Sequence, residues 1–185
     1  LEASLESEHD AVTEAAVVLL GRAARYLPAD SAHVRRVVER LLSALRTPSE
    51  LVQEAVASCL PALVRASAAA KDVPSIVDRL FVDLLHGDKY ATRRGAAYGL
   101  AGVVKGRGVS AIRELRILAR LSEAAHDTST TTTRQGALFA YELLASTLHV
   151  LLEPYVDGIL ADLLLCFGDT HADVREATQD AARVL

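Results

Sequence analysis

The sequence predicts an all-α protein, a solenoid built from antiparallel pairs of helices. Its composition favours helices over strands, because 51% of the residues are hydrophobic, only 4% are aromatic, and the apolar part is mostly Ala, Leu and Val. A small residue, here called the anchor, also recurs in similar surroundings at Ala15, Ala55, Gly95, Gly136 and Ala177. The steps between anchors are 40, 40, 41 and 41 residues, a period typical of helical repeat arrays.

All 185 residues are expected to form a single array of HEAT type, whose unit is a pair of helices. In each pair an amphipathic helix precedes the helix that carries the anchor, and a short turn rich in Asp, Ser, Thr and Gly joins them. One pair cannot bury both of its faces, so successive pairs must stack. The predicted elements are a leading second helix at about 8–27 and four helix pairs at about 31–68, 73–106, 109–149 and 153–185.

Three glycines, Gly95, Gly99 and Gly102, would lie on about one face of a predicted helix. A phosphate-binding loop would require a Walker or Rossmann pattern after a strand, and neither is present. A membrane helix seam would require an apolar helix of about twenty residues, which Arg93 and Arg94 interrupt. Each glycine costs about 1 kcal/mol of helix propensity relative to Ala, so the face needs a purpose. Tight packing of a neighbouring helix is the favoured interpretation, and a backbone surface for a partner is the alternative.

The net charge of −4 is unevenly distributed. Residues 89–134 carry 9 basic and 3 acidic side chains, which makes this segment basic in an otherwise acidic protein. Such a segment can be a solvated helix face, or it can bind an anionic partner through phosphate contacts. The candidates for a ribosome or partner surface are Lys89, Arg93, Arg94, Lys105 and Arg107, with Arg134 as a weaker candidate.

Arg93, Arg134 and Arg175 each stand two residues before an anchor, so they are expected to line up along one edge of the solenoid. The turns that precede them contain Asp88, Asp127 and Asp169. One interpretation is an Asp–Arg ladder that ties the turns to neighbouring repeats. The other is a stripe of guanidinium groups that binds phosphate.

Several function classes are not expected. No apolar run reaches the roughly 18 residues of a membrane span, and no nucleophile motif, metal-ligand spacing or cofactor motif is present. The protein is therefore predicted to be no enzyme, with no cofactor, no small-molecule substrate and no membrane contact. Cys59 and Cys166 are expected to be buried thiols in a reducing compartment. A chain that begins at Leu1 and has no methionine is expected to be a piece of a longer protein.

Particular phrases of the sequence are more specific than the repeat. They are "QEAVASCLP" (53–61), "DKYATRRGAAYGLAGVVKGRG" (88–108), "RQGALFAYELL" (134–144), "EPYV" (153–156) and "LLLCFGD" (163–169). Together they resemble the general-control translational activators, very large ribosome-associated activators of the kinase that acts on the initiation factor 2 α-subunit. The resemblance is to their central HEAT region, which is similar to translation elongation factor 3. It covers about residues 15–185.

This resemblance implies a cytoplasmic scaffold whose partners are the ribosome and an ATP-binding-cassette protein. The family helps deliver the starvation signal to the kinase from stalled or colliding ribosomes, and the kinase-binding segment is expected outside this chain. Residues 128–133, "TSTTTT", stand where the family commonly has a basic loop, which argues against phosphate binding by this loop. The alternatives are a passive solenoid spacer and a generic HEAT adaptor for another protein.

Overall fold

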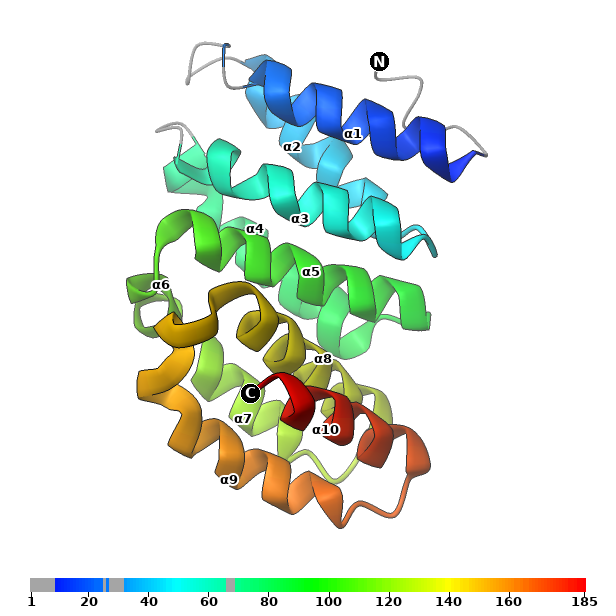
Figure 1. Ribbon diagram of the computed structural model, residues 1–185, viewed down its shortest axis with the longest axis vertical. Coiled ribbons are helices and arrows are strands. Elements are labelled where there is room, and N and C mark those ends of the chain that lie inside the picture. The colour runs from blue at the N-terminus through cyan, green and yellow to red at the C-terminus, as the bar shows by residue number, and fades with distance from the viewer. Residues whose placement is uncertain (1–8, 25, 27–31, 66–68) are drawn as a thin grey trace.

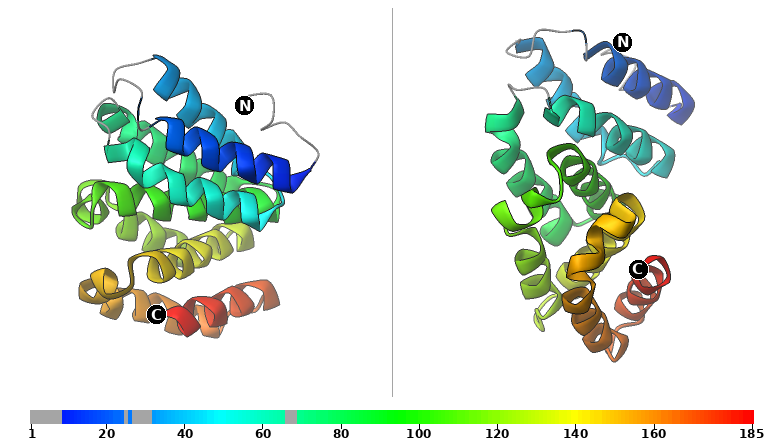
Figure 2. Two further views of the ribbon diagram at one scale, coloured as in Figure 1. Left: turned by 45° about the horizontal axis from the view of Figure 1, so that its top comes forward. Right: turned by 60° about the vertical axis from the view of Figure 1, so that its left-hand side comes forward.

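In the computed structural model, which describes residues 9–24, 26, 32–65 and 69–185, the chain forms a stack of helices in two layers (Figures 1 and 2). No strand occurs among these residues, so the prediction of an all-α solenoid is confirmed. The parts of the predicted elements at 8, 25, 27, 31 and 66–68 lie outside the described residues. The helices are α1 (Asp10–Ala24), α2 (Ala32–Ala44), α3 (Glu50–Arg65), α4 (Ala69–His86), α5 (Tyr90–Arg107), α6 (Ser110–Glu114), α7 (Ile117–Ala125), α8 (Thr131–Leu148), the 3-10 helix η2 (His149–Tyr155), α9 (Val156–Phe167) and α10 (Ala172–Val184).

The two layers follow from the alternation of helices along the chain. Helices α1, α3, α5, α8 and α10, which carry the anchors, pack one against the next, and α2, α4, α7 and α9 form the other layer (Figure 1). The core lies between the layers, with fully buried side chains such as Leu60, Leu84, Leu100 and Leu138. The turns that join the helices of one pair lie at one edge, here the turn edge, at 45–49, 87–89, 126–130 and 168–171. The C-terminal ends of α1, α3 and α5 lie at the opposite edge, here the connection edge (Figure 1).

One predicted helix is divided in the structure. The amphipathic run at 111–126 forms α6 and α7, which are separated at Arg116 in a left-handed conformation with φ 51°. In a continuous helix Ile112 and Ile117 would point about 140° apart, because each residue turns the chain by about 100°. Both side chains are buried, so the break allows both to face the core.

The glycine face of α5 meets the backbone of the preceding repeat. A Cβ atom added at Gly95 would stand 1.8 Å from the carbonyl oxygen of Leu45, and one at Gly102 would stand 2.7 Å from that of Ala57. At Gly99 it would lie 2.6 Å from a methyl group of Leu45. The anchor of the next repeat, Gly136, repeats the relationship, since its Cβ would stand 2.1 Å from the carbonyl oxygen of Leu84. These glycines therefore allow the helix pairs to approach closely.

A proline of α3, Pro61, lies where α5 approaches α3 closely. Pro61 has no N–H group, so the carbonyl oxygen of Ala57 lacks its usual donor four residues later in the helix. Gly102 lies over this carbonyl, and Gly106 lies against Pro61 itself, where an added Cβ would be 2.8 Å from the proline Cα. The irregular stretch of α3 thus faces the part of α5 that has no side chains.

Candidate partner-binding surface

Hydrogen bonds form a ladder along the turn edge. Their donors are the side chains that stand two residues before each anchor. Each side chain donates to a carbonyl oxygen of its own turn: Gln53 to Thr47 at 2.7 Å, Arg93 to Gly87 at 2.8 Å, Arg134 to Asp127 at 2.7 Å and Arg175 to Asp169 at 2.6 Å. Turn carbonyl groups that are removed from water need such donors. The ladder position therefore fixes each turn against the start of the helix that follows it.

The same ladder side chains reach forward to the next repeat. Gln53 donates to the carbonyl oxygen of Ala91 at 2.9 Å, and Arg93 donates to Oε1 of Gln135 at 2.7 Å. Arg134 donates to the carboxylate of Asp169, with Nε 2.6 Å from Oδ2. An Asp–Arg pair is thus present at only one of the three expected steps. Asp88 and Asp127 contribute only their backbone carbonyl oxygens to the ladder, and the carboxylate of Asp127 accepts hydrogen bonds from Ser129 instead.

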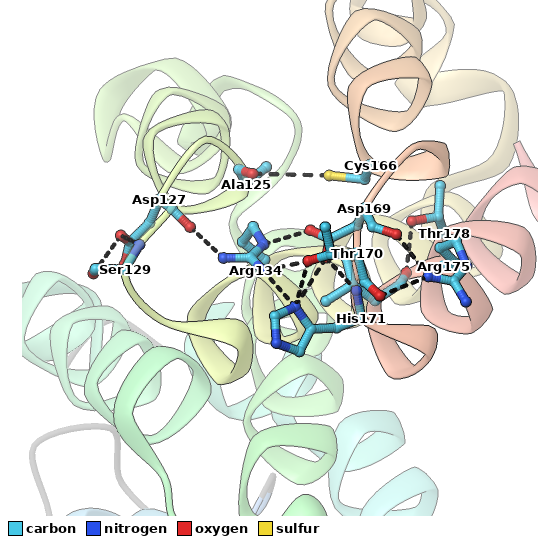
Figure 3. A network of polar contacts seen from close by, with 11 residues as sticks. Ala125, Asp127, Ser129, Arg134, Cys166, Asp169, Thr170, His171, Arg175 and Thr178 are labelled. Atoms are coloured by element: carbon cyan, nitrogen blue, oxygen red, sulfur yellow. Dashed lines mark hydrogen bonds and ion pairs between the residues drawn. The ribbon is translucent and has the colours of Figure 1, made fainter.

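The pair of Arg134 and Asp169 is the most enclosed ion pair of the ladder (Figure 3). Each side chain is only 10% exposed. Asp169 also accepts the backbone N–H of His171 at 2.8 Å. Burial alone would raise the pKa of Asp169, but the hydrogen bonds from Arg134 and His171 outweigh it and lower the pKa to about 2. The carboxylate is therefore ionised at neutral pH and is held by the solenoid itself.

Arg93 is buried, and no carboxylate of the described residues pairs with it. The residue is 6% exposed, and its guanidinium donates to Gly87, Asp88 and Gln135 while its Nε atom has no partner. Burial lowers the pKa of Arg93, because the charged form loses hydration. This side chain cannot reach a partner outside the solenoid, so it connects repeats.

The side chain of Arg94 lies between α5 and α8 and is also held by contacts within the chain. It forms a two-pronged ion pair with Glu142, and its guanidinium carbon lies 5.3 Å from the ring centre of Phe139 and 5.7 Å from that of Tyr98. Burial alone would lower the pKa of Arg94, but the hydrogen bonds and charge of Glu142 raise it. With its side chain 15% exposed, Arg94 stabilises the contact between two repeats.

The six candidate residues do not form one surface. Arg93, Arg94 and Arg134 are committed to contacts between repeats, whereas Lys89, Lys105 and Arg107 are exposed. Lys89 precedes the first residue of α5, and Lys105 lies in its last turn. At a rise of 1.5 Å per residue these two positions are about 24 Å apart along the helix. Lys89 therefore belongs to the turn edge, and Lys105 and Arg107 belong to the connection edge.

Three further exposed cations lie outside the six candidates: Arg22 and Arg65 were missed from the sequence, and Arg113 belongs to the basic segment 89–134 but was not among the candidates. Arg22 and Arg65 lie in the last turns of α1 and α3, and Arg113 lies in α6, all at the connection edge (Figure 1). Arg65 and Lys105 each stand ten residues after an anchor, so the repeat register could have shown that they match. A count of charge along the chain instead emphasised residues 89–134.

A buried polar cluster joins α7, α8 and α9 without forming an open site. The hydroxyl group of Tyr141 donates to Oδ2 of Asp162 at 2.5 Å, and that of Ser122 donates to Oδ1 at 3.1 Å. Asp162 is only 5% exposed. Burial, together with the hydrogen bond to Asp162, raises the pKa of Tyr141. The cluster therefore acts as a fixed connection between two repeats.

Within the described ranges, no group of three or more His, Cys, Asp or Glu side chains is placed to hold a metal ion. None of the described helices combines the length and apolar character needed to cross a membrane. Cys59 and Cys166 are buried and unpaired with one another, and their sulfur atoms lie 3.8 Å from carbonyl oxygens of the preceding repeats.

Comparison with known sequences gives consistent results. The family described as EF3 N-terminal HEAT repeat matches residues 93–185. The human protein named "Stalled ribosome sensor GCN1" is 46% identical over 180 residues, covering 97% of this chain. The Arabidopsis thaliana protein named "Protein ILITYHIA" is 45% identical over 184 residues, and the Saccharomyces cerevisiae protein named "eIF-2-alpha kinase activator GCN1" is 37% identical over 185 residues. Each of these two alignments covers 100% of the chain.

The chain spans 7% of the length of each of these relatives. Among solved structures, a designed armadillo repeat protein in complex with the peptide (KR)4 aligns over 99% of this chain and 79% of its own. The identity is 17% and the TM-score is 0.48.

Proposed function

Because the chain belongs to the GCN1 family of HEAT-repeat proteins, we propose that it is a non-catalytic scaffold segment of a translational activator. In this proposal the parent protein binds ribosomes in the cytoplasm and helps to activate the initiation factor 2 α-subunit kinase when ribosomes stall or amino acids are scarce. The observation that carries the proposal is 37–46% identity over nearly the whole chain to proteins named for a stalled-ribosome sensor and a kinase activator.

The architecture supports a role in positioning partners. Successive helix pairs are joined by buried polar contacts at Arg93, Arg134 and Asp162, which hold neighbouring repeats in a defined orientation. Such a stack presents long edges on which a large partner can bind. The partners we propose are the ribosome and an ATP-binding-cassette protein, and we place kinase binding outside these 185 residues.

Sedimentation with purified ribosomes tests the proposal. The chain is mixed with ribosomes, layered on a sucrose cushion and centrifuged at salt concentrations from about 50 to 200 mM, the range over which phosphate contacts weaken strongly. We expect the chain to pellet with ribosomes at low salt and to be released as salt rises. If the chain stays in the supernatant at every salt concentration, the segment is no ribosome-binding part of the scaffold.

A passive spacer is the second candidate. It is favoured by the burial of Arg93 and Arg134 and by the pairing of Arg94, which remove three of the six cations expected to bind a partner. For a spacer, the charge of the remaining exposed cations would not affect ribosome association of the parent protein, whereas a disrupted ladder would. Ribosome sedimentation of the parent protein carrying either Lys105→Gln or Asp169→Asn separates the two roles.

A further inference from the structure

We propose that the connection edge binds the phosphate backbone of double-helical RNA through five exposed cations, here called the cationic edge. This inference rests on the proposed function, since the ribosome is the source of such RNA. The five residues come from the ends of three stacked helices and from the short helix that follows them. They are Arg22 in α1, Arg65 in α3, Lys105 and Arg107 in α5, and Arg113 in α6.

The cations of different helices are brought together because α1, α3 and α5 run in the same direction (Figures 1 and 2). A Cβ added at Gly21, beside Arg22, would touch Cys59 of α3, six residues before Arg65. A Cβ added at Gly106, between Lys105 and Arg107, would lie 3.2 Å from Cβ of Val64, beside Arg65. The last turns of α3 and α5 are therefore direct neighbours, whereas the last turn of α1 lies against α3 nearly two turns before Arg65. The cations thus follow one another along the same edge of successive repeats.

The cations of this row are unpaired, whereas many arginines elsewhere are paired. Arg46, Arg79, Arg94, Arg120 and Arg134 each form an ion pair with Asp or Glu. In contrast, none of the five cations of the cationic edge forms an ion pair with a residue that the structure describes, and all five are exposed. Glu114 is an exposed acid beside Arg113, and it leaves most of the row without a counter-charge.

Interaction with the helix dipole does not account for the whole row. A cation in the last turn of a helix is stabilised by about 0.3–1 kcal/mol, which could explain one cation for each helix. However, α5 carries two cations there, α6 adds another, and the last turn of α8 contains none. Among the described helices, the last-turn cations without an ion pair are thus concentrated at the ends of α1, α3 and α5 and in α6, whereas the last-turn cation of α10, Arg183, is paired with Asp180.

The side chains favour phosphate over bases. Four of the five cations are arginines, whose planar guanidinium groups match phosphate oxygens with two parallel donors. The last turns of α3 and α5 and the whole of α6 contain no aromatic residue on which a base could stack, and the exposed ring of Tyr26 stands four residues after Arg22, at one end of the row. Because packed helices are about 8–10 Å apart, the row offers positive charge at intervals of about that distance along one edge. An RNA double helix is recognised mainly through its shape and backbone, which fits such an edge.

Fluorescence anisotropy with a labelled RNA duplex of about 16 base pairs tests the inference, a length that a shape-reading protein domain can span. Binding of the full chain is measured against salt concentration and compared with the double variant Lys105→Gln/Arg107→Gln. Each lost phosphate contact should reduce the slope of log K against log salt by about 1. We therefore expect the double variant to lose about 2 from the slope and to bind roughly tenfold more weakly at low salt.

The matched control is Lys89→Gln/Arg79→Gln, which removes the same amount of positive charge from the turn edge and from α4. Lys89 is exposed, and the pair of Arg79 with Glu39 is exposed on both sides, so little stability should be lost. We expect this control to bind like the unmodified chain. If the control weakens as much as the double variant, or if the unmodified chain does not bind the duplex, the inference is wrong.

The ribosome sedimentation assay separates failure of the inference from failure of the proposed function. If the chain pellets with ribosomes but does not bind the duplex, the scaffold proposal stands and the RNA inference fails. A loss of pelleting by the double variant in that situation would assign the cationic edge to an acidic protein surface. If the chain binds the duplex through the cationic edge but does not pellet with ribosomes, the RNA inference stands and the proposed ribosome contact fails.

Discussion

Arg134 of α8 donates two hydrogen bonds to Asp169 in the turn between α9 and α10, Nε to Oδ2 at 2.6 Å and Nη2 to Oδ1 at 3.2 Å. The two residues are 35 positions apart, and the pair joins one repeat to the next. Because Arg134 also donates to the carbonyl oxygen of Asp127, one guanidinium group fixes two successive turns. The pair is therefore a good place to test how much the ladder contributes to stability.

Replacing Asp169 by asparagine should lower the free energy of unfolding by about 1–3 kcal/mol, since a largely buried guanidinium would lose its charged partner. Urea denaturation followed by circular dichroism measures the change. The control is Glu176→Gln, an exposed acid of α10 beyond its first turn, which should change stability by less than about 0.5 kcal/mol. If both substitutions lower the free energy of unfolding equally, the pair of Arg134 and Asp169 contributes no more to stability than an exposed acid does.

The same carboxylate predicts a dependence of stability on pH. The pKa of Asp169 in the folded chain is about 2, below the value of about 3.9 for an unfolded chain. The unfolded state then binds the proton more tightly, so this stabilisation is present above about pH 4 and is lost as the pH falls toward 2. We expect the melting temperature of Asp169→Asn to fall less steeply over this range than that of the unmodified chain. If the melting temperatures of the two proteins fall equally as the pH is lowered, the low pKa of Asp169 does not contribute to stability.

Gly95→Ala should destabilise the chain by about 1–3 kcal/mol, because a Cβ 1.8 Å from the carbonyl oxygen of Leu45 forces α5 away from the preceding repeat. The matched control is Gly158→Ala in α9, where no atom lies within 4 Å of the added Cβ. In the control the better helix propensity of Ala should increase stability by about 0.5–1 kcal/mol. Thermal denaturation of both variants should therefore give shifts of opposite sign.

Tyr141→Phe should cost about 1–3 kcal/mol, because it removes a hydrogen bond from the buried carboxylate of Asp162. Tyr155→Phe is the control, since that ring is only partly buried and lies outside the cluster of Ser122, Tyr141 and Asp162. Chemical denaturation provides the comparison. A neutral result at Tyr141 would mean that water or another group satisfies the carboxylate equally well.

The stack itself could be predicted from the sequence because the anchors repeat with little drift. A small residue at the same place in each unit requires close approach, and Gly95 and Gly136 indeed lie against backbone carbonyl groups of the preceding repeat. The division of α6 from α7 could not be predicted in this way. Both halves have helical periodicity, and only the burial of Ile112 together with Ile117 shows why the chain must change direction at Arg116.

The roles of individual arginines could be predicted less well. Arg93 and Arg94 are adjacent, and their sequence context suggested an exposed basic patch. Their contacts are with Gln135 and Glu142, which are 42 and 48 positions away. Charge counted along a chain does not show which cations meet a partner from another repeat. The repeat register provides more information, since it matches Arg65 with Lys105 and distinguishes both from the ladder.

The ladder has a mechanical consequence, because its forward hydrogen bonds all lie at one edge. From Gln53 to Ala91, from Arg93 to Gln135 and from Arg134 to Asp169, the turn edge resists separation of neighbouring repeats. We therefore expect the distance between neighbouring repeats to vary little at the turn edge and most at the connection edge when the solenoid bends. Amide hydrogen exchange should then be slower in the second turns of α5 and α8, at residues 94–97 and 135–138, than in their last turns, because the amides of both regions have hydrogen-bond acceptors within the helix. Such bending would let the cationic edge adjust its spacing to a curved surface, while the hydrogen bonds of the turn edge hold neighbouring repeats together.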